Sequence, residues 1–285
     1  MIKNSNLQLI AAFAGLLLAS TGCGEDAGSP DDPNAQTRAV TLNFAGVIGD
    51  QAFGCGQSYE GIGATSSTLT LQDFRLYISD VRLVAADGSE VPVALDQETP
   101  FQTEDLALLD FEDGSGGCES GTAEINTRIT GEVPEGDYTG LRFVLGVPFD
   151  LNHGDAALAP SPLNLSSMFW SWNGGYKFLR VDARSAGLPD GLRLHLGSSG
   201  CDMNGDGAVT GCANPNRPEV TLAAFDVDAD TVKVDIAALL AGSDIDANAA
   251  DTPPGCMSTL EDADCGPIFE SLGLGAGPQT FFSVQ

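Results

Sequence analysis

Apolar and polar residues alternate at several separate places in this chain, with the period of two that is typical of half-buried β-strands. The alternating segments are 40–44, 74–78, 91–95, 141–147 and 192–196. Turn residues separate them throughout, and Asp87–Gly88 forms a favourable hairpin turn before the third segment. The pattern therefore predicts a fold built from antiparallel β-strands.

Two details refine this prediction. The apolar positions change phase soon after the second alternating segment, which predicts a β-bulge near 79–80. Helical periodicity is confined to 236–240, where Asp235 is a candidate N-cap, and to 267–272. With 42% apolar residues the chain can bury a core. We expect an all-β fold over 39–285, a single antiparallel β-sandwich with long disulfide-stapled loops and one or two short helices.

The N-terminus has the pattern of a targeting segment. The apolar run 9–19 is too short to cross a bilayer and fits the hydrophobic region of a signal peptide. Small residues then precede Cys23, as in a lipoprotein cleavage site, so we expect a lipoprotein-type signal peptide over 1–22 and lipidation of Cys23. An ordinary signal peptide with an incidental cysteine is the alternative. An acidic, flexible tether follows over 23–38. The chain is therefore expected to be exported, as a periplasm-facing or cell-surface lipoprotein of the outer membrane.

Six cysteines remain after Cys23, and an even number in an exported chain predicts disulfides. The favoured near-neighbour pairs are Cys201–Cys212 and Cys256–Cys265, which leaves Cys55–Cys118. No pair has the CxxC spacing of zinc ribbons or thioredoxin-like proteins.

Charge and motifs exclude several functions. The chain has 12 basic and 40 acidic residues, a net charge of −28, whereas nucleic-acid binding needs a basic face. The nucleophile elbow, HExxH, phosphate-binding loop and dinucleotide fingerprint are all missing from the sequence. A hydrolase is therefore disfavoured, and we do not expect an enzyme.

The two histidines and two tryptophans all lie within 141–217. On its strand His195 faces away from the leucines on either side of it, so it is not ordinary core filling. Neutral imidazole suits copper and zinc, which makes His153 and His195 a candidate metal pair. Trp170 and Trp172 are either core residues or a redox pair, and Met168 is either a soft copper ligand or a gap-filler.

The segment 202–209 matches the first part of an EF-hand calcium loop. Asp202, Asn204 and Asp206 stand at the first three ligand positions, and a glycine follows. Ala213 replaces the glutamate expected at the last position, so the bidentate ligand is missing. A polar, disulfide-closed loop is the alternative to calcium binding.

Several motifs together resemble one known family, the MbnP-like proteins, also called the metallo-mystery pair four-Cys proteins. The resemblance covers nearly all of 39–285. It is carried by the motifs at 73–84, 108–114, 146–153, 168–178, 195–198 and 254–258. The chain is also similar in chemistry to the copper proteins MopE and CorA of methane oxidisers.

The resemblance implies an exported copper protein that is itself a substrate. Its partner would be a di-haem, MauG-like cytochrome c peroxidase, MbnH, which would oxidise Trp170 or Trp172 to kynurenine, with Trp170 slightly favoured. The new aryl amine and ketone would join His153 and His195, with Met168 as a further candidate, in a Cu(I) site. The alternative function is a structural or adhesive β-sandwich lipoprotein, with disulfides and calcium but no copper role.

Overall fold

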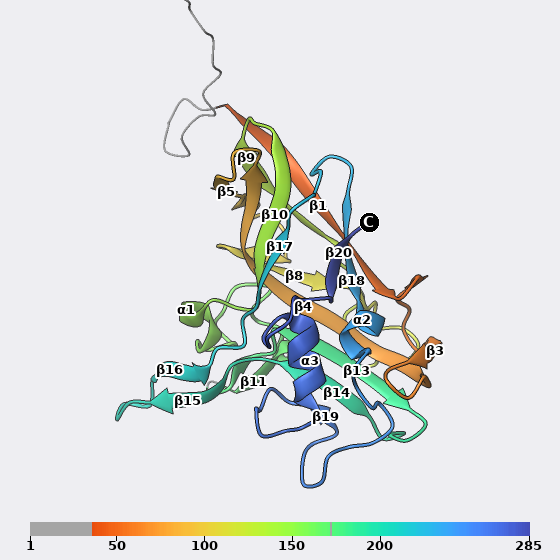
Figure 1. The fold of residues 1–285 in the computed structure, drawn as a ribbon. Helices are drawn as coiled ribbons and strands as arrows, with labels where there is room; N and C mark the ends of the chain where they lie inside the picture. The colour runs from red at the N-terminus through yellow and green to blue at the C-terminus, as the bar shows by residue number, and fades with distance from the viewer. Residues whose placement is uncertain (1–35, 172) are drawn as a thin grey trace, which may run out of the picture.

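The computed structural model describes residues 36–171 and 173–285 (Figure 1). The predicted signal peptide 1–22, the lipidation site Cys23, most of the tether and Trp172 lie outside the described residues. The first strand begins at Thr37, so regular structure starts two residues before the domain boundary expected from the sequence. No helix within the described part of the chain is long and apolar enough to span a bilayer.

The fold is mostly β, as predicted. A 6-stranded sheet contains β1 (Thr37–Ile48), β2 (Gln51–Ala52), β6 (Ala94–Leu95), β9 (Arg128–Pro134), β18 (Thr231–Asp235) and β20 (Phe282–Val284). A 10-stranded sheet contains β3 (Ser58–Ile62), β4 (Ser67–Ala85), β5 (Glu90–Pro92), β7 (Gln102–Thr103), β8 (Leu106–Asp110), β10 (Tyr138–Leu145), β13 (Leu179–Ser185), β14 (Leu192–Leu196), β17 (Glu219–Leu222) and β19 (Gly255–Cys256). Two hairpins, β11 (Phe169–Ser171) with β12 (Gly175–Tyr176) and β15 (Ser199–Met203) with β16 (Val209–Asn214), complete the strands.

Aromatic side chains from both large sheets meet in the core. Phe44 of β1 and Phe143 of β10 have ring centroids 6.1 Å apart, and Phe143 lies 5.0 Å from Phe282 of β20. These rings are at most 4% exposed. The two sheets are therefore packed face to face, as a β-sandwich requires.

The sheets are not purely antiparallel, which corrects one part of the prediction. β1 pairs in parallel with β18, and β14 pairs in parallel with β19. Alternation of apolar residues has the same period in both kinds of pairing, so the sequence pattern could not reveal strand direction.

The predicted bulge lies in β4. Pairing between β4 and β10 slips between Arg82 and Ser79, and Asp80 there has a left-handed φ of 50°. The extra residue explains why the apolar positions change phase at this point.

Both predicted helices are present. Asp235 caps α2 (Ile236–Leu240) by accepting a hydrogen bond from the backbone N–H of Ala237 at 2.9 Å. The second, α3 (Cys265–Leu272), begins two residues earlier than expected. The short helix α1 (Phe149–Asn152) and the 3-10 helix η1 (Ser166–Met168) were not predicted.

The middle of β4 is buried on both faces, and this positions the candidate site. Phe74 and Leu76 face the sandwich core, whereas Asp73, Arg75 and Tyr77 on the opposite face are also fully buried. The long segment between β10 and β13 covers that outer face, where Tyr77 donates a hydrogen bond to the Pro162 carbonyl at 3.0 Å. The structure therefore has a third layer, made of loops and the β11–β12 hairpin.

Three disulfides close the loops, with the pairing favoured from the sequence. Cys55–Cys118 joins the loop before β3 to the loop after β8. Cys201–Cys212 crosses the β15–β16 hairpin, and Cys256–Cys265 ties β19 to α3.

Candidate metal centre

Trp170 and His195 lie together on the outer face of the larger sheet. The Trp170 and His195 ring centroids are 6.3 Å apart. Gly197 makes this packing possible, because a Cβ atom at that position would lie 2.5 Å from Cζ3 of Trp170 and 2.7 Å from the Tyr176 carbonyl. The indole therefore rests directly on the backbone that follows His195.

His195 is held by a carboxylate on the neighbouring strand. Its Nε2 lies 2.6 Å from Oδ1 of Asp182, and the imidazole is 5% exposed. Burial lowers the pKa of His195 and outweighs the opposing effect of Asp182, so the ring is neutral near pH 7. Burial alone would raise the pKa of Asp182, but the hydrogen bonds and charges of His195 and Arg180 lower it. A neutral imidazole beside an ionised carboxylate donates from Nε2 and keeps a lone pair on Nδ1.

That lone pair has no partner in the described residues. His195 Nδ1 and Trp170 Nε1 are both buried, and neither has a hydrogen-bond partner in the described part of the chain. Buried polar atoms are normally satisfied, so an orphaned acceptor beside an orphaned donor calls for an explanation. A carboxylate that orients an imidazole for a metal is the usual arrangement behind a metal-binding histidine. The donor chemistry therefore fits a metal that takes imidazole nitrogen.

An ionic network lies behind this pair. Arg180 contacts both Asp182, at 2.6 Å, and Asp73, at 3.2 Å. Asp73 in turn pairs with Arg75 at 2.5 Å, and every member is at least four-fifths buried. These residues occupy facing positions on β4 and β13. The network was not predicted from the sequence, although the alternation of charged with apolar residues at 73–76 and 179–182 was the available signal.

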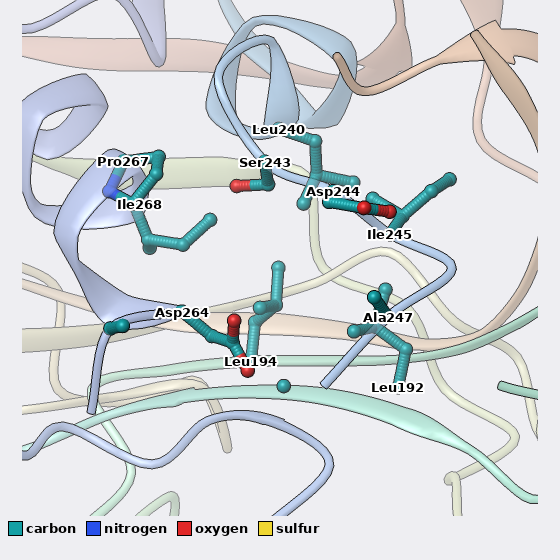
Figure 2. A pocket seen from close by; sticks show the side chains of 12 residues that line it. Leu192, Leu194, Leu240, Ser243, Asp244, Ile245, Ala247, Asp264, Pro267 and Ile268 are labelled. Atoms are coloured by element: carbon teal, nitrogen blue, oxygen red, sulfur yellow. The ribbon is translucent and has the colours of Figure 1, made fainter. Parts of the chain in front are cut away.

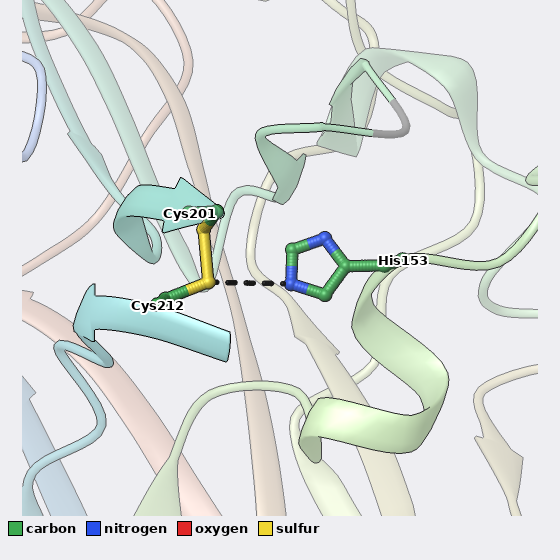
Figure 3. A group of neighbouring side chains, drawn as sticks. All are labelled: His153, Cys201 and Cys212. Atoms are coloured by element: carbon green, nitrogen blue, oxygen red, sulfur yellow. Dashed lines mark hydrogen bonds between the residues drawn. A yellow bond between two sulfur atoms is a disulfide. The ribbon is translucent and has the colours of Figure 1, made fainter. Parts of the chain in front are cut away.

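His153 lies at a different contact. It follows α1 as its C-cap, and its Nε2 is 3.5 Å from Sγ of Cys212 (Figure 3). The same nitrogen lies 3.1 Å from Nδ2 of Asn152. His153 therefore lies against a disulfide, whereas His195 lies against Asp182 and Trp170. The predicted four-residue copper set is not gathered into one group by the described contacts.

The remaining candidate ligands are Met168 and the predicted calcium ligands, and the structure places each in a defined environment. Met168 is fully buried in the hydrophobic core, which is the gap-filling position weighed from the sequence. In the β15–β16 turn, Oδ1 of Asn204 accepts hydrogen bonds from the backbone N–H groups of Asp206 at 3.0 Å and Ala208 at 2.9 Å. That oxygen therefore stabilises the turn, whereas calcium binding at Asp202, Asn204 and Asp206 stays a prediction.

Two cavities away from the Trp170–His195 pair offer fewer groups that could bind a metal. The cavity between α2, α3 and β14 is lined mainly by aliphatic side chains (Figure 2). The Asp264 carboxylate on its wall accepts a hydrogen bond from the Ala249 backbone N–H at 2.8 Å. We interpret this cavity as a packing gap. A wider, more apolar cleft is lined by His153, Phe169 and Ser171, next to the β11–β12 hairpin.

Comparison with known proteins decides the family. The MbnP family model matches residues 37–258. This chain belongs to the MbnP family. The solved structure of MbnP from Methylosinus trichosporium is 32% identical, with a TM-score of 0.77, and the match covers 87% of this chain and 98% of that one. A comparison with curated proteins found no match.

The MbnP match contains the whole Trp170–His195 arrangement. It ends at Ser258, a fully buried residue whose hydroxyl donates to the His195 carbonyl at 2.7 Å and accepts from the Gly197 backbone N–H at 2.7 Å. Ser258 therefore fixes the strand end on which the indole rests. The helix α3 lies beyond the matched region.

Proposed function

We propose that this MbnP-family chain is an exported copper-binding protein whose Cu(I) site is completed by oxidation of Trp170. The observation that carries the proposal is the orphaned Nδ1 of His195 beside the indole, with Nε2 held by Asp182. His153, the only other imidazole in the sequence, is the proposed second histidine ligand. Cu(I) suits imidazole nitrogen and low coordination numbers.

Ring opening would supply the ligand that the indole lacks. An indole N–H is a donor only and offers no lone pair to a metal. Conversion to kynurenine breaks the C2–C3 bond, leaves a ketone at C3 and an aryl amine on the ring, and releases C2 as formate. Opening the ring to N-formylkynurenine is a four-electron oxidation that adds two oxygen atoms, so two molecules of hydrogen peroxide are consumed at the haems of the partner and two molecules of water are formed in the net reaction. Hydrolysis of the N-formyl group then consumes one water and releases the formate. The chain is thus the partner's substrate and is not proposed to be an enzyme.

The proposed partner is a di-haem, MauG-like peroxidase of the MbnH type. Trp170 is half-buried, so part of this residue reaches the surface at which a partner would dock, and electron transfer from the indole would cross a short distance. The net charge of −28 favours a partner with a basic docking face. Lipidation at Cys23 would keep the chain at the outer membrane, facing the periplasm or the cell exterior.

The first test is peptide mass spectrometry of the chain produced with and without an active di-haem partner. We expect one tryptophan of the 168–178 peptide to lose one carbon and gain one oxygen only when the partner is active. Trp170→Phe should abolish the change, and Trp172→Phe is the matched control. Modification that persists in Trp170→Phe would move the site to Trp172.

Copper titration then tests the ligands. The oxidised form should bind Cu(I) at least ~10-fold more tightly than the unmodified chain, and His195→Gln should remove that gain. Circular dichroism checks that each variant is folded. Unmodified tryptophan in the presence of an active partner would refute the maturation step. The chain would then be better explained as a structural or adhesive lipoprotein.

A further inference from the structure

The Cys201–Cys212 disulfide and His153 form a second cluster of metal-binding atoms. One ligand atom from each of the three residues lies within 4.8 Å of the other two, and His153 Nε2 is 3.5 Å from Sγ of Cys212 (Figure 3). We propose that this disulfide is a redox-controlled metal site: after reduction, the two thiolates and His153 bind one Cu(I) ion. This inference does not rest on Trp170 oxidation. The two thiolates are ligands that the proposed Trp170 site does not use, whereas His153 is common to both proposals.

The hairpin disulfide is the one in which both cysteines are accessible; in the first disulfide Cys55 is half-buried as well, but its partner Cys118 is fully buried. Cys201 and Cys212 are both half-buried on the β15–β16 hairpin, which extends away from the body of the molecule (Figure 1). By contrast, Cys118 in the first disulfide and both Cys256 and Cys265 in the third are at most 2% exposed. Thiol–disulfide exchange requires access to a sulfur atom, so exposure favours the hairpin disulfide.

Reduction takes two thiol–disulfide exchange steps and consumes one dithiol. A dithiol reductant attacks Sγ of Cys201, and the S–S bond breaks so that Cys212 leaves as a thiolate beside Nε2 of His153. The second thiol of the reductant then attacks the mixed disulfide and releases Cys201. The protein disulfide gains two electrons, and the dithiol loses two electrons as it becomes a disulfide. The protons from the dithiol pass to the thiolates, and Cu(I) displaces them on binding.

The hairpin keeps the ligands together after reduction. Cys201 and Cys212 are directly opposite each other in the ladder, with further pairs at Ser199–Asn214 and Asp202–Gly211. The backbone pairing therefore holds both sulfur atoms on facing positions without the covalent bond. Two thiolates and one imidazole make a three-ligand set that suits Cu(I), whereas structural zinc takes four protein ligands.

The second cysteine cluster in the described residues, which contains Cys55, Cys118 and Glu112, is less suited to Cu(I). Glu112 lies near Cys55 and Cys118, but its carboxylate accepts hydrogen bonds from the Thr122 backbone N–H at 2.7 Å and the Gly114 backbone N–H at 2.8 Å. It also faces the buried guanidinium of Arg75 at 3.6 Å. A carboxylate committed in this way is a poor match for a soft metal.

The experiment uses the chain produced without any peroxidase partner, so that its tryptophans are unmodified. Graded reduction with dithiothreitol is followed by alkylation and peptide mass spectrometry. Among the six disulfide-bonded cysteines, we expect Cys201 and Cys212 to be labelled first, while the four cysteines of the other two disulfides stay paired. Earlier labelling of Cys256 and Cys265, or of Cys55 and Cys118, would overturn the proposal.

Cu(I) titration of the mildly reduced chain against a chromophoric chelator is the second part. We expect one Cu(I) per chain and protection of both hairpin cysteines from alkylation. His153→Gln should weaken binding by ~10-fold or more. Asp155→Asn, an exposed change in the same loop, is the matched control. Equal binding by the unreduced chain, by Cys201→Ser/Cys212→Ser or by His153→Gln would refute the site, whatever the fate of Trp170.

Discussion

Removal of the Cys55–Cys118 disulfide should be the most destabilising of the disulfide deletions, because this bond closes the longest loop. Its cysteines are 63 residues apart, and the loop-closure entropy of the unfolded chain then corresponds to about 4 kcal/mol. Cys256 and Cys265 are only 9 residues apart, for which the same relation gives about 3 kcal/mol. The expected difference is therefore roughly 1 to 2 kcal/mol.

The assay compares Cys55→Ala/Cys118→Ala with Cys256→Ala/Cys265→Ala by urea unfolding at one pH. The free energy of unfolding in water comes from linear extrapolation. Its slope against urea concentration, the m-value, should be similar in both variants. Cys118, Cys256 and Cys265 are buried and Cys55 is half-buried, so loss of sulfur packing is slightly greater in the Cys256–Cys265 variant and opposes the expected difference. A larger loss of stability in the Cys256–Cys265 variant would refute the loop-length reasoning.

Three further perturbations test the site and its surroundings. Gly197→Ala places a methyl group 2.5 Å from the Trp170 ring, so we expect a loss of about 1–3 kcal/mol in thermal unfolding and a shifted tryptophan emission; unchanged values would contradict the packing. Asp182→Asn breaks a buried ion pair and should cost about 3 kcal/mol, and NMR of the His195 ring nitrogens should show a changed tautomer balance. Burial raises the pKa of Asp110 to about 8, above the unfolded value of about 4, so its contribution to stability is full below pH ~4 and is lost as pH rises through ~8. Asp110→Asn should flatten that fall in urea midpoints between pH 5 and pH 9, and an unchanged slope would reject the assignment.

Local patterns in the sequence predicted much of the fold. Alternation located β1, β10 and β14, and the phase change in β4 located the bulge at Asp80. These features depend on neighbouring residues, so a single sequence reveals them. Parallel pairing of β1 with β18 joins segments far apart in the chain, and side-chain alternation carries no signal for it.

The candidate site was predicted only in part. His195 was expected to face away from its flanking leucines, and the structure places it against Asp182 on the adjacent strand. Its neighbours could not be predicted, because charge at Asp73 and Arg75 normally indicates exposure, whereas here the loop layer covers them. His153 was grouped with His195 by residue type and by the family resemblance, and its contact with Cys212 depends on how the β15–β16 hairpin packs.

Both edges of β18 are paired with strands from distant parts of the chain. β1 pairs with one edge in parallel, β20 pairs with the other in antiparallel, and Phe282 of β20 packs against Phe143 in the core. Without β20, one edge of β18 would be exposed and the core beside Phe143 would be open. β20 is therefore a short edge strand that covers the longer β18, and short edge strands limit pairing between the sheets of different molecules.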